Sequence, residues 1–140
     1  MVIVEENHSS ESIIRNPELP YINSLAQQYG SATKWAGVAH PSLPNYLAMI
    51  SGSTWNSTSD STPAKATYPG PTLADELASK NVGWKAYMED MPHRCDTTDT
   101  YGPNGYDVNH NPFVYFRSIT GTPSQCNRIV PFDEFGADLK

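Results

Sequence analysis

Ser42 is the residue in this sequence best placed to act as a nucleophile. It follows His40-Pro41 and directly precedes a predicted helix over residues 43–50. A hydroxyl at a helix N-terminus lies beside backbone N–H groups that lack partners within the helix, and the helix dipole favours negative charge there. Such surroundings stabilise an oxyanion and favour nucleophilic attack. Because serine is also among the commonest N-cap residues, a purely structural capping role is the alternative.

Four further residues carry groups that would suit phosphate chemistry. Glu6 and Asn7 offer a carboxylate and an amide carbonyl, which are hard oxygen ligands suited to a divalent cation. Asn45 lies on the first turn of the predicted helix, where its amide could donate to a phosphoryl oxygen. His110 ends a long polar loop and could bind an anion or act as a general acid. Taken singly, each also fits a structural role. Glu6 would be a solvated strand end, and Asn7 would start a turn. Asn45 would be a solvent-facing helix residue, and His110 a surface imidazole.

Three predicted strands end in polar residues. The apolar run over 1–6 predicts a buried strand that ends at Glu6-Asn7, and residues 33–39 predict a second strand shortly before Ser42. Alternating apolar residues predict a third strand over 84–89. In parallel sheets, ligands collect at the carboxyl ends of the strands. We therefore expect these polar clusters to meet at one edge of a sheet.

The predicted helices are short and clearly bounded. They cover a turn within 9–15, residues 19–29, residues 43–50, a segment capped by Thr72, and the final stretch 131–140. Asp75, three positions after Thr72, completes the pattern of a capping box. Two long loops, about 53–71 and 92–112, are rich in small polar residues. The order of elements predicts an α/β fold in which helices flank a mostly parallel sheet.

Length and charge exclude several classes of protein. The chain has 140 residues, about one ordinary domain, and a net charge of −6, which argues against nucleic-acid partners. No apolar run approaches the ~18 residues of a transmembrane helix. A strand at the first residue and an unfinished helix at the last predict a domain truncated at its C-terminus. Cys95 and Cys126 would pair in an exported protein or stay as free thiols in a cytosolic one.

Five segments, in order along the chain, resemble one family. They are residues 2–9, 40–52, 70–77, 84–92 and 110–116. Together they are similar to the phosphoesterase family of bacterial and fungal acid phosphatases and phospholipases C, within the alkaline-phosphatase superfamily. The resemblance implies an alkaline-phosphatase-like fold, of which residues 1–140 would be the N-terminal part of a single domain.

The resemblance also implies roles for the candidate residues. Glu6 and Asn7 match a metal-binding Glu-Asn pair, and Ser42 matches the nucleophile, which also touches the metal and is transiently phosphorylated. Asn45 resembles the asparagine that follows the nucleophile in this superfamily, and His110 matches a histidine near the phosphate. The implied cofactor is a divalent metal ion of unassigned identity. Because the family's other metal ligands lie in a C-terminal half, we expect little or no activity from the 140 residues alone.

The expected function of the parent protein is metal-dependent hydrolysis of small-molecule or lipid phosphate esters. The reaction, of the acid phosphatase or phospholipase C type, would pass through a phosphoseryl intermediate at Ser42. Cys95 and Cys126 also resemble family positions, which supports a disulfide and a secreted or extracytoplasmic location. Two alternatives stay open. One is a serine esterase without metal, although the chain lacks its Gly-x-Ser-x-Gly motif; the other is a non-catalytic, secreted surface-binding module.

Overall fold

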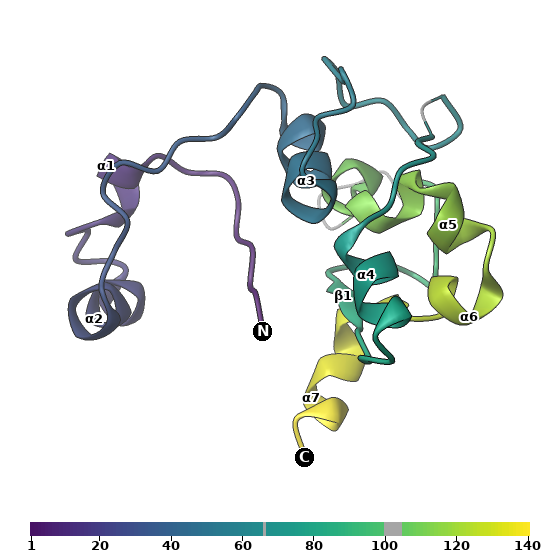
Figure 1. Cartoon of the computed structure of the whole chain (residues 1–140). Coiled ribbons are helices and arrows are strands. Elements are labelled where there is room, and N and C mark those ends of the chain that lie inside the picture. The colour runs from purple at the N-terminus through teal and green to yellow at the C-terminus, as the bar shows by residue number, and fades with distance from the viewer. Residues whose placement is uncertain (66, 100–104) are drawn as a thin grey trace. The chain divides into compact units, whose positions relative to one another are not determined.

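The computed structural model describes residues 1–65, 67–99 and 105–140. The chain divides into two compact units, residues 1–36 and 37–140, and each is described by itself (Figure 1). None of the described residues of the first unit is buried, so the hydrophobic core belongs to the second. None of the described helices has the length and apolar character that a membrane span requires.

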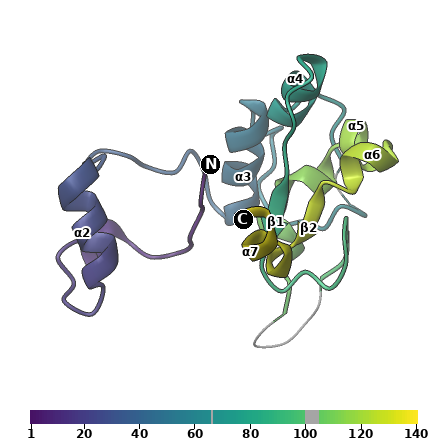
Figure 2. The same cartoon turned by 90° about the horizontal axis from the view of Figure 1, so that it is seen from below.

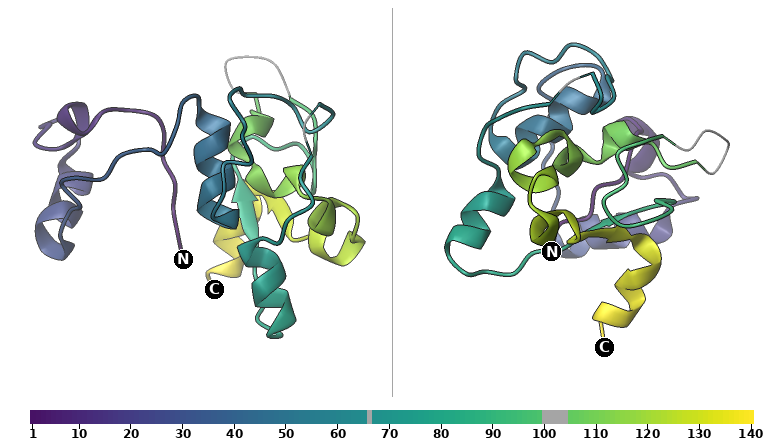
Figure 3. Two further views of the ribbon diagram at one scale, coloured as in Figure 1. Left: turned by 45° about the horizontal axis from the view of Figure 1, so that its top comes forward. Right: turned by 90° about the vertical axis from the view of Figure 1, so that its right-hand side faces the viewer.

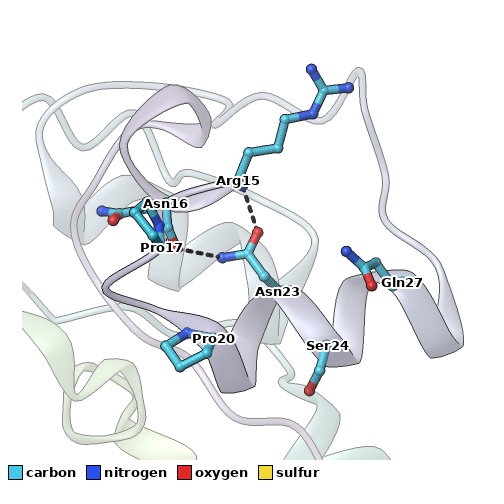
Figure 4. A pocket seen from close by; sticks show the side chains of 7 residues that line it. All are labelled: Arg15, Asn16, Pro17, Pro20, Asn23, Ser24 and Gln27. Atoms are coloured by element: carbon cyan, nitrogen blue, oxygen red, sulfur yellow. Dashed lines mark hydrogen bonds between the residues drawn. The ribbon is translucent and has the colours of Figure 1, made fainter.

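The first unit consists of two helices tied together by one asparagine. Helix α1 (Ser10–Ile13) and helix α2 (Pro20–Tyr29) lie where the sequence predicts them. The Asn23 amide donates to the carbonyls of Ile13 and Leu19, at 3.0 and 2.8 Å, and accepts from the N–H of Arg15. Figure 4 shows Asn23 at the centre of a surface hollow of about 370 Å³. No candidate site residue lines this hollow. The hydrogen bonds of Asn23 stabilise the local structure of the first unit.

The predicted strands over 1–6 and 33–39 are wrong, because neither segment forms a strand in this structure. Met1 and Val2 are among the most exposed apolar residues of the chain. A strand needs the backbone of a neighbour to satisfy its N–H and C=O groups, and no described segment pairs with either run. Of the three polar clusters expected at strand ends, only Glu89-Asp90 follows a strand.

The second unit contains a small parallel sheet of two strands. β1 (Ala86–Met88) pairs with β2 (Ile129–Pro131), with Ala86 opposite Ile129. Figure 2 shows the strands side by side, with α3 on one side and α5 and α6 on the other. The fold is therefore α/β with a parallel sheet, as predicted, although the described sheet is smaller than expected. β1 is the shortened form of the strand predicted over 84–89.

Short helices surround this sheet. They are α3 (Ser42–Ser51), α4 (Leu73–Ser79), α5 (Arg117–Thr120), α6 (Pro123–Cys126) and α7 (Phe135–Asp138), with 3-10 turns η1 (Val108–His110), η2 (Pro112–Tyr115) and η3 (Phe132–Glu134). The C-terminal end of α3 and the Thr72 cap at the start of α4 agree with the sequence predictions. Gly52 ends α3 with φ of +73°, and Thr72 accepts from the N–H of Asp75 at 3.3 Å in a complete capping box. The stretch predicted as one final helix is divided between η3 and α7.

The core fixes α3 firmly in the second unit. Leu43, Leu47 and Ile50 lie on one face of α3 and are buried in one cluster with apolar residues of η1, η2 and α4. Burying each such side chain contributes about 1.5–3 kcal/mol. Figure 3 shows α3 beside the strands, with the chain of η1 and η2 close to it. Ser42, on the first turn of α3, therefore belongs to a helix that is held in place by the core.

Side-chain contacts hold the loop over 53–71 against this core. The indole N–H of Trp55 donates to Ser51 Oγ at 2.8 Å, and its ring stacks on Tyr68 with centroids 5.7 Å apart. At Gly70 a Cβ would lie 2.0 Å from the Trp55 ring, so only glycine allows this approach. The loop is thus a fixed part of the fold where it faces α3.

A disulfide joins Cys95 to Cys126, as the family resemblance implies. It connects the loop after β1 to the end of α6, and the backbone N–H of Cys95 also donates to the carbonyl of Ile129 at 3.0 Å. The bridge therefore closes the loop that returns the chain to β2.

An exposed ion-pair group, which we call the C-terminal clamp, ties α7 and η3 to β1. Its members are Lys85, Arg94, Glu134 and Asp138, and Lys85 Nζ lies 2.6 Å from Asp138 Oδ2. The hydrogen bond from Lys85 lowers the pKa of Asp138. Partial desolvation raises the pKa of Glu134, but hydrogen bonds from Lys85 and Arg94 outweigh it and leave that pKa below its ordinary value.

Candidate active site

Ser42 is the first residue of α3 and is partly buried. The N-cap position is Pro41, so Ser42 is not the capping residue that the structural alternative supposed. The sequence places the helix start one residue later, a difference within the usual spread of helix boundaries. Ser42 thus has the backbone position expected of a nucleophile at a helix N-terminus.

Asn45 fastens the segment that leads into Ser42. Its Oδ1 accepts from the backbone N–H groups of Val38 and Ala39 at 2.8 and 3.1 Å. Its Nδ2 donates to the carbonyls of Ala39 and Pro41 at 2.8 and 3.0 Å. The Asn45 side chain, on the first turn of α3, thereby holds the backbone of residues 38–41, which lead into Ser42. In this arrangement both amide hydrogens are directed at backbone, rather than outward.

Asp60 reaches the same turn from the long loop. Its Oδ1 accepts from the backbone N–H of Leu43 at 2.8 Å. The next residue in the loop, Ser61, is held by the core, because the hydroxyl of the fully buried Tyr115 donates to its carbonyl at 2.7 Å. The loop is therefore anchored directly beside Asp60. This carboxylate occupies part of the region where sequence reasoning expected unpartnered N–H groups.

His110 lies on the side of α3 that carries Ser42. Its ring centroid is 5.6 Å from that of Tyr46, which is buried and follows Ser42 by one helical turn. His110 Nε2 also lies 4.0 Å from a carboxylate oxygen of Asp107. About 38% of the His110 side chain is exposed, which leaves the imidazole accessible to a ligand. The second unit therefore places Ser42 and Asn45 on the first turn of α3 and His110 against Tyr46, one turn further along.

A buried hydrogen-bonded chain supports the turn that holds His110. Asn111 is fully buried and donates to the Tyr106 hydroxyl at 2.7 Å, which in turn donates to the Asp96 carbonyl at 3.0 Å. Burial raises the pKa of Tyr106, so it stays a neutral donor. Asn111 Oδ1 has no hydrogen-bond partner among the described residues. Because η1 is anchored in this way, His110 has a fixed backbone position.

Glu6 and Asn7 belong to the first unit, where both lie in an exposed, irregular segment. Their carboxylate and amide oxygens are adjacent in the chain and have the hard character that Mg²⁺ or Ca²⁺ prefers. Among the residues that the structure describes, no group of three or more His, Cys, Asp or Glu side chains could hold a metal. The pair therefore fits a cation in the type of its donors.

The carboxyl ends of β1 and β2 border an acidic hollow of about 420 Å³. It is lined by Asp90, Met91, Pro92, Pro131, Phe132, Asp133 and Glu134. None of the candidate residues lies in it. The expectation that the polar clusters meet at the strand ends is not met in the described sheet.

Sequence reasoning missed three residues that shape this site. Tyr46 carries a signal, since its spacing of four from Ser42 puts it on the same helix face. Asp60 and Tyr115 carry none, because their contacts join positions 17 and 54 residues apart. Such pairings depend on the tertiary fold and leave no local pattern.

Comparison with known proteins gives a consistent result. The Phosphoesterase family model matches residues 1–140. The chain is 35% identical to a phosphatidylinositol-3-phosphatase of Mycobacterium tuberculosis, over 96% of this chain and 42% of that protein. It is 34% identical to a phosphate-repressible acid phosphatase of Penicillium chrysogenum, over 85% of this chain and 29% of that protein. An acid phosphatase of Aspergillus fumigatus is also 34% identical, over 82% and 27% respectively.

The chain thus spans less than half the length of these curated relatives. No solved structure matches it.

Proposed function

Because the chain belongs to the Phosphoesterase family, we propose that it supplies the nucleophile and part of the metal site for hydrolysis of phosphate esters. The observation that supports the proposal is that Ser42 and Asn45 share the first turn of α3, while His110 packs against Tyr46, one turn further along the same helix. The relatives named as phosphatases support the class of reaction.

In the proposed reaction, Ser42 Oγ attacks phosphorus in line with the leaving oxygen. The new Oγ–P bond forms as the bond between phosphorus and the leaving alcohol breaks. His110 neutralises the charge on the leaving oxygen or donates a proton to it. Water then attacks the phosphoseryl group; one of its protons returns to Ser42 Oγ, and the product released is inorganic phosphate from a monoester or the remaining phosphomonoester from a phosphodiester. The α3 dipole favours the negative charge that develops near Ser42.

Asn45 contributes to this reaction in one of two ways. The resemblance gives it a direct role as a donor to a phosphoryl oxygen. Its hydrogen bonds to Ala39 and Pro41 support a role in holding the Ser42 segment instead. Donation to substrate would require one of these backbone bonds to be exchanged.

A divalent metal is part of the proposal. The family resemblance assigns Glu6, Asn7 and Ser42 as ligands, each of which would bind the ion through an oxygen atom. Such an ion, when bound, neutralises phosphoryl charge and lowers the pKa of a coordinated hydroxyl. All other steps above depend on the chain's own side chains.

We further propose that residues 1–140 form the N-terminal part of a single phosphoesterase domain with an alkaline-phosphatase-like fold. The family match along the whole chain supports this view. The disulfide between Cys95 and Cys126 supports a secreted or extracytoplasmic location, because such bonds persist in oxidising compartments. The substrate would be a small-molecule or lipid phosphate ester, either an acid phosphatase or a phospholipase C substrate.

The experiment is hydrolysis of an aryl phosphate and of a lipid phosphodiester by the full-length protein and its Ser42→Ala variant. We expect the variant to lose at least about a thousandfold in rate, since nucleophile removal in comparable enzymes costs that much or more. Ser79→Ala, on the last turn of α4, where the hydroxyl donates to the Glu76 carbonyl, is the matched control. Wild-type rates in Ser42→Ala would refute the proposal, and turnover of a carboxylic ester instead would favour a serine esterase.

A further inference from the structure

The first turn of α3 has few backbone donors to offer an anion. The N–H groups of Ser42 and Leu43 are the first two of the helix, and the third position is Pro44, which has no N–H. Asp60 already accepts from the N–H of Leu43 at 2.8 Å. The Leu43 N–H, one of the first backbone donors of the helix, is therefore taken by a side chain of the protein itself.

The loop brings Asp60 to this position by anchors on both sides. On one side, Tyr115 donates from the core to the Ser61 carbonyl at 2.7 Å. On the other, the Trp55 indole bonds Ser51 at the end of α3 at 2.8 Å. Ser59 and Ser61 also share a hydroxyl hydrogen bond of 2.8 Å across Asp60. Because these contacts fix the flanking chain, the carboxylate is held beside the start of α3.

We propose that Asp60 is a positioning residue for Ser42. Its carboxylate fixes the first turn of α3 through the Leu43 amide and keeps that amide from phosphoryl oxygens. The inference rests on the proposed function, because it concerns the nucleophile of that same site. It assigns the loop over 53–71 a defined part in phosphate binding.

Two consequences distinguish positioning from simple anchoring of the loop. Loss of the carboxylate releases the first turn, so the rate of the chemical step falls. The same loss opens the Leu43 amide, so inorganic phosphate gains a donor and binds more tightly. An anchor without influence on the site would lower stability and leave both quantities unchanged.

The experiment compares Asp60→Ala and Asp60→Asn in the full-length protein, with hydrolysis of an aryl phosphate as the assay. We expect Asp60→Ala to lower kcat about tenfold, since small misplacements of reacting groups are costly. The inhibition constant of inorganic phosphate should fall severalfold in the same variant. Asp60→Asn keeps an oxygen that can accept from Leu43, so it should stay within about twofold of wild type.

The matched control is Asp75→Ala, which removes the capping carboxylate of α4. It should lower stability and leave kcat and phosphate inhibition unchanged. Hydrogen exchange at the Leu43 amide provides a readout that does not depend on catalysis, and it should accelerate in Asp60→Ala alone. If Ser42→Ala retains activity, the proposed function fails, but the exchange result still tests the contact.

Three results would overturn the proposal. One is an unchanged kcat with unchanged phosphate inhibition in Asp60→Ala. The second is equal loss in Asp60→Asn and Asp60→Ala, which would assign the effect to charge rather than to the hydrogen bond. The third is unchanged exchange at the Leu43 amide, which would mean that Asp60 does not hold it.

Discussion

Replacing Asn45 by alanine should loosen the segment that leads into Ser42. Asn45 accepts from Val38 and Ala39 and donates to Ala39 and Pro41, with four hydrogen bonds between 2.8 and 3.1 Å. Alanine keeps the helix and removes all four. The perturbation therefore acts on the approach to Ser42 without disturbing the buried face of α3.

The expected loss follows from these bonds. Each hydrogen bond of this kind contributes about 0.5–1.5 kcal/mol net. Val38 is 68% exposed, so its N–H can bond water once Asn45 is gone. Alanine also gains a few tenths of a kcal/mol in helix propensity. The unfolding free energy should therefore fall by about 2–3 kcal/mol, near the low end of the sum.

The assay is urea unfolding of the full-length protein, with kcat measured on the same preparations. Met49→Ala is the control, because Met49 lies on the exposed side of the same helix and should change stability by less than about 0.5 kcal/mol. We expect Asn45→Ala to lose both stability and kcat. A variant within about 0.5 kcal/mol of wild type would refute the idea that Asn45 holds this segment.

Three further predictions concern the C-terminal clamp, the disulfide and the metal. The pKa values of Glu134 and Asp138 are lowered in the folded protein, so the stabilisation by the clamp is fully present above their ordinary pKa values of 4.5 and 3.8. This stabilisation is lost as the pH falls through the lowered pKa values. NMR titration of the two carboxyl groups with midpoints at or above 4.5 and 3.8 would contradict this. Replacing Cys95 and Cys126 by serine should cost about 3–4 kcal/mol for a separation of 31 residues, and equal urea midpoints for variant and wild type would oppose it. A chelator should abolish phosphate-ester hydrolysis and added divalent cation should restore it, whereas full activity in chelator would exclude the metal.

The helices of the second unit were predictable because their signals are local. Leu43, Leu47 and Ile50 repeat at helical spacing, and Gly52 takes the left-handed φ that ends α3. At the start of α4, the Thr72 hydroxyl accepts from the Asp75 N–H, and the Asp75 carboxylate accepts from the Thr72 N–H. These features depend on residues within a few positions of one another, so sequence alone contains them.

The strands were harder to predict because a strand depends on its neighbour. The apolar run at 1–6 has the composition of a strand and no described partner, so it stays irregular. β2 escaped prediction because three residues carry too little periodicity. Its pairing with β1 is stabilised by distant contacts, including the disulfide from Cys95.

The candidate residues were chosen from residue type and resemblance, and the contacts that support them were not predicted. Ser42 and Asn45 lie on the first turn of α3, and His110 packs against Tyr46 of the same helix. The direction of the Asn45 amide could not be read from sequence, since it depends on how 38–41 folds back. Asp60 was hidden in a loop whose composition suggests only irregular chain.

The central claim is that Ser42 is the nucleophile, and trapping the phosphoenzyme tests it most directly. The full-length protein is mixed with a phosphate ester, quenched in acid within the first turnover, and digested for mass spectrometry. We predict phosphoserine at position 42 in the wild type and none in Ser42→Ala. Phosphate on a different residue, or hydrolysis by Ser42→Ala at the wild-type rate, would contradict the account.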